Sequence, residues 1–183
     1  MDLFKKTICS ATLIAVFMLV AGFNASGAEN SVGSGNDNWW TAYPEQSSAN
    51  ASEVEHPQWV LDALEKKPVV IYVHKGCSYC KPQTDAMAEV VSEYGDKFAY
   101  YDISAETSDS KAEEAIRAYD PNGGIAYVPL TAIVTLAPDS EGKVRVIWHS
   151  TDEVTGKAWI EEYVQDALSY HNENSGDWEK SEA

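Results

Sequence analysis

Two cysteines stand two residues apart in the segment HKGCSYCKP, at Cys77 and Cys80, and this spacing could support chemistry. The third cysteine, Cys9, lies in a hydrophobic N-terminal stretch. A close pair can act as a redox couple, because one thiolate attacks a disulfide and the second thiol resolves the mixed disulfide. The same pair can also form a structural disulfide or half of a metal site, so the spacing leaves three interpretations open.

The two other interpretations have weaker support in the sequence. A structural disulfide across so short a loop would stabilise little, because the entropic gain grows with loop length. A zinc site needs four ligands, and no histidine stands at ligand spacing. The four histidines are scattered: His56, His74, His149 and His171. We therefore expect no metal and no cofactor, with a soft-metal carrier that uses only the two thiols as an alternative.

Residues 1–28 are predicted to be a signal peptide. Lys5 and Lys6 precede an apolar stretch over 13–23, and small residues at Ser26 and Ala28 suit cleavage after Ala28. Cys9 would leave with this leader. The mature chain is then expected outside the cytoplasm, secreted or in the cell envelope, where a disulfide can persist. An uncleaved leader would instead anchor the protein to a membrane.

The charge of the chain excludes some classes of partner. The formal net charge is −16, and it becomes −17 when the leader removes two lysines and one aspartate. Nucleic acids and anionic lipids need a basic partner surface, so we expect no nucleic-acid partner and no stable membrane insertion after cleavage.

The composition along the chain predicts one domain over residues 53–171. Residues 29–52 are rich in Ser, Asn and Gly and are predicted to be a flexible linker, although Trp39 and Trp40 are expected to pack on the domain's surface. Residues 172–183 are predicted to be an acidic, mobile tail.

The hydrophobic pattern within the domain predicts an α/β fold. Strands are expected at 68–74, 97–103, 127–136 and 143–149, and helices near 57–67, after the cysteines to Tyr94, at 110–120 and after a cap at Thr155. A helical crossover makes the first two strands parallel, and a turn makes the last two antiparallel. The result is a central mixed sheet of about four strands flanked by helices. Cys77 then precedes a helix N-terminus, where the helix dipole favours a thiolate.

In this order of elements, residues 57–170 resemble the thioredoxin-like superfamily. The resemblance implies that Cys77 is the attacking thiol and Cys80 the resolving thiol. It also implies that Pro129, in the segment YVPL, is the family's cis-proline beside the disulfide, and that Val128 offers its backbone to the substrate.

The sequence departs from ordinary thioredoxins at the site itself. The motif GCSYCK lacks the Trp and the Pro of WCGPCK, and Ile71 stands where thioredoxins place a buried acid. The Ser78–Tyr79 dipeptide is more similar to exported disulfide isomerases and oxidants.

The sequence therefore predicts an exported thiol–disulfide oxidoreductase with Cys77 and Cys80 as its redox couple. Its expected partners are cysteine-containing exported proteins and a separate redox partner that the sequence does not identify. The alternative is a non-enzymatic binding module of the same fold, in which the cysteines carry a soft metal or form a structural disulfide.

Overall fold

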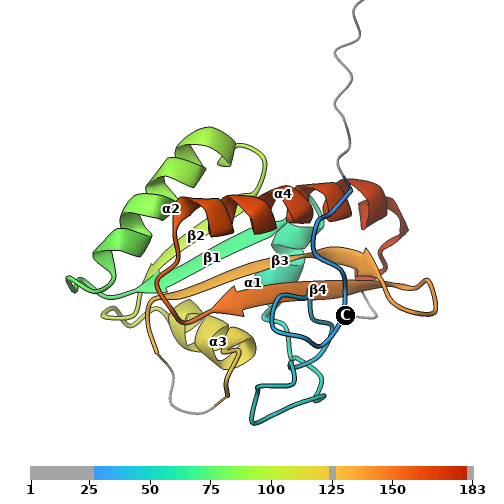
Figure 1. The fold of residues 1–183 in the computed structure, drawn as a ribbon, viewed down its shortest axis with the longest axis horizontal. Helices are drawn as coiled ribbons and strands as arrows, with labels where there is room; N and C mark the ends of the chain where they lie inside the picture. The colour runs from blue at the N-terminus through green and yellow to red at the C-terminus, as the bar shows by residue number, and fades with distance from the viewer. Residues whose placement is uncertain (1–26, 124–126, 181–183) are drawn as a thin grey trace, which may run out of the picture.

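The computed structural model describes residues 27–123 and 127–180 of the 183-residue chain, and Figure 1 shows its elements. The elements in chain order are α1 (Gln58–Leu64), β1 (Val69–His74), α2 (Lys81–Tyr94), β2 (Ala99–Ser104), α3 (Ser110–Tyr119), β3 (Leu130–Pro138), β4 (Val144–Thr151), α4 (Lys157–Asn174) and a short 3-10 helix, η1 (Ser175–Asp177). Within these described ranges, no helix is long and apolar enough to span a membrane.

The four strands form one mixed sheet in the order β2-β1-β3-β4. The pair β1–β2 is parallel, whereas β1–β3 and β3–β4 are antiparallel. The α/β class and the mixed four-stranded sheet that the sequence predicts are therefore confirmed. The central position of β1 explains its unbroken apolar sequence, because a strand with neighbours on both sides and helices over both faces has no solvent-facing side.

Alternate residues of β1 enter two separate cores. Val69, Ile71 and Val73 pack with α1 and α3 on one face of the sheet. Val70 and Tyr72 pack with α2 and α4 on the other face (Figure 1). Each fully buried aliphatic side chain stabilises the fold by about 1.5–3 kcal/mol, so β1 and the loop that follows it are held from both sides.

The prediction of a flexible linker over residues 29–52 is wrong. The Trp39 and Trp40 side chains are 0% and 1% exposed, so they belong to the core and not to its surface. Trp40 also exchanges two backbone hydrogen bonds with Trp148 of β4, at 2.8 and 3.0 Å. Burying two indoles, each with about 150–250 Å² of surface, outweighs the polar composition of the segment. The domain therefore begins before residue 53.

The prediction of a mobile tail over residues 172–183 is also wrong for its described part. Helix α4 continues to Asn174 and η1 follows it. Beyond η1, Lys180 forms ion pairs with Asp62 at 2.5 Å and Glu65 at 2.7 Å. Residues 181–183, and residues 1–26 of the predicted signal peptide, lie outside the described residues.

Candidate functional site

Strand β1 ends at the candidate site and α2 begins there. The loop after His74 is turned by two backbone hydrogen bonds, from Cys77 N–H to Lys75 O at 2.8 Å and from Cys80 N–H to Cys77 O at 3.2 Å. Cys80 is the N-cap residue of α2, and a proline in the first turn suits the missing intrahelical donors there. The predicted junction between a buried strand and a helix N-terminus is therefore present at the cysteines.

The two cysteines lie together but in different surroundings. Their Sγ atoms are 2.9 Å apart and both residues are free thiols. Cys77 is exposed, whereas Cys80 is only 1% exposed. A reagent in solution can therefore reach Cys77 directly, while Cys80 is covered.

The surroundings move the two thiol pKa values in opposite directions. A hydrogen bond from the Cys80 thiol lowers the pKa of Cys77, and backbone N–H groups, first that of Cys80, lower it further. Burial raises the pKa of Cys80, and the neighbouring Cys77 raises it further. The sequence predicted a favoured thiolate at Cys77 from the helix N-terminus, but the main cause is the partner thiol. Of the two thiols, Cys77 therefore ionises first and Cys80 keeps its proton longer.

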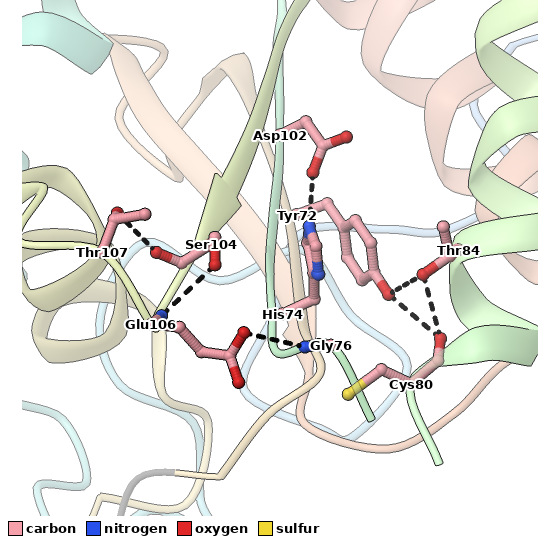
Figure 2. Close-up of polar contacts among 9 residues, drawn as sticks. All are labelled: Tyr72, His74, Gly76, Cys80, Thr84, Asp102, Ser104, Glu106 and Thr107. Carbon is pink, nitrogen blue, oxygen red and sulfur yellow. Dashed lines mark hydrogen bonds and ion pairs between the residues drawn. The ribbon is translucent and has the colours of Figure 1, made fainter. Parts of the chain in front are cut away.

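A partly buried hydroxyl network holds the first turn of α2 next to Cys80 (Figure 2). The Tyr72 hydroxyl lies 3.2 Å from Cys80 O and 2.9 Å from Thr84 Oγ1. The same Cys80 carbonyl also accepts hydrogen bonds from Thr84, through its backbone N–H at 3.0 Å and its hydroxyl at 3.2 Å. This role of Tyr72 was not predicted from the sequence, although a residue with a hydroxyl group in an otherwise apolar strand was a usable signal.

His74 lies at the end of β1 in a second polar contact of the site. Its Nε2 is 2.8 Å from Asp102 Oδ1 of the neighbouring strand β2. Its ring stacks on the Tyr72 ring with centroids 4.9 Å apart and an interplanar angle of 17° (Figure 2). The strand register explains the contact between His74 and Asp102. Asp102 pairs with Tyr72, and Tyr72 lies two residues before His74, so all three side chains are on the same face of the sheet.

A carboxylate of the β2–α3 connection reaches the cysteine loop. Glu106 Oε2 accepts a hydrogen bond from Gly76 N–H at 3.3 Å. Contacts within the connection hold the Glu106 backbone in place: its N–H donates to Ser104 Oγ at 3.3 Å, and Thr107 Oγ1 donates to Ser104 O at 2.9 Å (Figure 2). The acid therefore stands next to the residue that precedes Cys77. Ile71 is fully buried in the core.

Gln83 joins α2 to two other parts of the chain. Its buried amide donates to Thr131 Oγ1 of β3 at 2.9 Å, and its carbonyl oxygen accepts from Thr155 N–H at 2.6 Å. The sequence predicted Thr155 as the cap of the last helix, but that helix starts at Lys157 with Gly156 as its N-cap. Thr155 instead helps to fix the helix that begins after Cys80.

Val128 and Pro129 lie at the same end of the sheet as the cysteine loop. Strands β1 and β3 are antiparallel, and Val73 pairs with Leu130. Pro129, which precedes Leu130, therefore lies beside the end of β1. The peptide bond between Val128 and Pro129 is cis, Pro129 is buried and Val128 is half-buried. That these two residues bind a substrate remains a prediction.

Each of the three remaining histidines makes a separate polar contact. His149 Nδ1 bonds Asn38 O at 2.8 Å, His56 Nδ1 bonds the Tyr119 hydroxyl at 3.1 Å, and His171 Nε2 bonds Leu64 O at 2.7 Å. Within residues 27–123 and 127–180, no group of three or more His, Cys, Asp or Glu residues could hold a metal ion.

No protein-family model and no curated protein sequence matches the chain. One solved structure with some likeness is described as "Structure of a malarial protein"; it is 12% identical, with a TM-score of 0.39, and the match covers 56% of this chain and 98% of that chain. A likeness of this size assigns neither fold nor function. The fold and the site therefore define an α/β domain with a pair of cysteines at its β1–α2 junction.

Proposed function

We propose that the protein is an exported thiol–disulfide oxidoreductase of the thioredoxin-like class, in which Cys77 attacks and Cys80 resolves. The observation that carries this proposal is the contrast within the pair. One thiol is exposed with a lowered pKa, and 2.9 Å away the other is covered with a raised pKa. A structural disulfide has no need of such a difference, whereas a nucleophile and a resolving thiol do.

The proposed reaction is a two-step exchange. The Cys77 thiolate attacks one sulfur of a substrate disulfide, forms a mixed disulfide and releases the other substrate sulfur as a thiolate, which takes up a proton. Cys80 then loses its proton, attacks Cys77 Sγ as a thiolate and releases the second substrate sulfur as a thiolate, which also takes up a proton. Two electrons and two protons pass to the substrate, and a Cys77–Cys80 disulfide remains. The reverse sequence oxidises a substrate dithiol.

The proposed substrates are cysteine-containing exported proteins, and a separate redox partner resets the pair. Val128 and Pro129 are the proposed substrate-binding residues, because they lie at the end of the sheet where β1 delivers the cysteines. An extended substrate segment could pair with the backbone there as an added strand. Export follows from the predicted leader and sets an environment in which disulfides are stable.

A disulfide-exchange assay on the purified protein tests this proposal, with metal analysis of the same sample. We expect Cys77→Ser to abolish exchange, and Cys80→Ser to accumulate mixed disulfides that are visible on non-reducing gels. Preferential alkylation of Cys80 in the reduced protein would reverse the assigned roles. A protein that exchanges no disulfides and retains a stoichiometric soft metal would support the alternative, a metal-carrying binding module.

A further inference from the structure

The first described residues of the chain converge on one buried carboxylate. Asp166 of α4 is 3% exposed. It accepts hydrogen bonds from Glu29 N–H at 2.8 Å, from Asn30 N–H at 2.9 Å and from the Trp39 indole N–H at 3.3 Å. Among the residues that the structure describes, no lysine or arginine pairs with Asp166. Three N–H donors satisfy the oxygens of this carboxylate, but none of them carries a positive charge. A cation in place of one donor would therefore stabilise the buried charge further.

The Glu29 nitrogen lies at a small cavity whose lining is mostly acidic. The cavity has a volume of about 240 Å³ and includes Gly27, Glu29, Glu161, Glu162 and Asp166 in its lining. Lys157 reaches Glu161, at 3.8 Å, and the Asn30 side chain donates to Glu162 at 2.8 Å. The local potential at the Glu29 nitrogen is therefore negative. If the chain began at Glu29, Gly27 would no longer fill part of this cavity.

We propose that this cavity is the binding site for a new N-terminus, made by cleavage between Ala28 and Glu29. Hydrolysis of that bond consumes one water molecule and is catalysed by a protease that removes export leaders. Ala28 receives the carboxylate, and the freed amine of Glu29 takes up a proton to become an ammonium group. This α-ammonium remains where the amide now lies and forms an ion pair with Asp166.

The ion pair would lock the whole N-terminal segment onto the domain. Figure 1 shows the start of the described chain (blue) beside α4, and contacts to α4 follow along it. The Tyr170 hydroxyl donates to Asn30 O at 2.9 Å, and the Tyr163 hydroxyl donates to Asp37 O at 3.0 Å. The hydrogen bond from the Glu29 amide to the Asp166 carboxylate is already charge-assisted. Cleavage adds a full positive charge to the donor, and its Coulombic attraction to Asp166 holds this segment more firmly than in the uncleaved chain. The inference depends on the leader and is independent of cysteine chemistry.

The experiment starts from the full-length chain, expressed in a host that exports it. Mass spectrometry of the exported protein first identifies its N-terminal residue, which we expect to be Glu29. The native protein is then treated with an amine-acetylating reagent near neutral pH, and acetylation of the α-amine is followed with time. The matched pair of variants is Asp166→Asn, which removes the charge at the site, and Glu173→Gln, which removes a charge of the same helix that does not line the cavity and that accepts a hydrogen bond from Ser169 Oγ at 3.3 Å.

The proposal requires three results together. The N-terminus is Glu29, its α-amine is acetylated at least about tenfold faster in Asp166→Asn than in the wild type, and Glu173→Gln behaves as the wild type does. We also expect Asp166→Asn to lower the melting temperature by about 5 °C or more. An exported chain that starts at another residue overturns the proposal, as does an α-amine that reacts equally fast in the wild type. If Asp166→Asn does not fold, the wild type alone tests the proposal, because fast acetylation of its α-amine would overturn the ion pair.

Discussion

Replacing Tyr72 with Phe isolates the hydroxyl network below the cysteines. The Tyr72 ring is fully buried and Phe fills the same volume, so the change creates almost no cavity. It removes one contact to Cys80 O at 3.2 Å and one to Thr84 Oγ1 at 2.9 Å. No buried carbonyl is left without a donor, because Thr84 still bonds Cys80 O. At about 0.5–1.5 kcal/mol for each net hydrogen bond, the loss of the two contacts should lower the unfolding free energy by about 1–3 kcal/mol.

The informative assay is alkylation of Cys80 in native protein, in a Cys77→Ser background. Cys80 is 1% exposed, so it reacts only when the first turn of α2 opens. The hydroxyl contact to Cys80 O stabilises the closed turn. If its loss destabilises that turn by about 0.5–1.5 kcal/mol, Cys80 should react roughly 2- to 12-fold faster.

Tyr163→Phe is the matched control for this prediction. Tyr163 is also buried, and its hydroxyl donates to Asp37 O at 3.0 Å, on a part of α4 that does not contact the cysteines. This variant should lose about 0.5–1.5 kcal/mol of stability and leave the Cys80 alkylation rate unchanged. Equal acceleration in both variants would show that only global stability matters, and no acceleration in Tyr72→Phe would refute the proposed role of its hydroxyl.

Three further predictions use other parts of the structure. Because the Cys80 thiol is the main cause of the lowered Cys77 pKa, Cys80→Ala should slow iodoacetamide alkylation of Cys77 at neutral pH, and Cys80→Ser, which keeps a donor, should slow it less; equal rates would assign the shift to the helix N-terminus instead. Trp40→Ala should reduce the unfolding free energy in urea by about 3–5 kcal/mol, since Trp40 is 1% exposed, and a loss below about 1 kcal/mol would contradict its place in the core. Burial lowers the pKa of His149 from 6.5 to about 4. The neutral imidazole therefore contributes about 3 kcal/mol of stability above about pH 6.5. This contribution is lost as the pH falls from about 6.5 toward 4, because the unfolded chain then takes up a proton that the folded chain does not. His149→Phe should therefore lose less stability than the wild type between pH 7 and pH 4.5, measured by urea unfolding, and parallel losses would exclude this titration.

The sequence predicted the sheet well because local patterns determine it. The unbroken apolar run of β1 needs cover on both faces, and the structure provides it. Helical spacing after the cysteines predicts α2, and the turn residues predict the pairing of β3 with β4. Both patterns involve residues that are close in sequence. The cysteine pair was visible for the same reason, since its two members are only three positions apart.

The errors have the opposite cause, because they depend on partners far along the chain. Trp39 and Trp40 stand among polar residues, and only β4 and α4, more than a hundred residues away, supply the surface that buries them. Lys180 is likewise held by Asp62, 118 positions earlier. Composition indicates whether a segment can bury itself, but it does not reveal a distant surface that will bury it.

The two thiol pKa values also give the proposed reaction an order. In the reduced pair, the Cys80 thiol donates to Cys77, and this contact lowers the pKa of Cys77 while it raises the pKa of Cys80. Once Cys77 is bonded to a substrate sulfur, it carries no negative charge. The contributions of Cys77 that raise the Cys80 pKa then disappear, and burial alone remains to raise it. Cys80 therefore ionises more easily only after the mixed disulfide has formed, which is the step at which a resolving thiolate is needed.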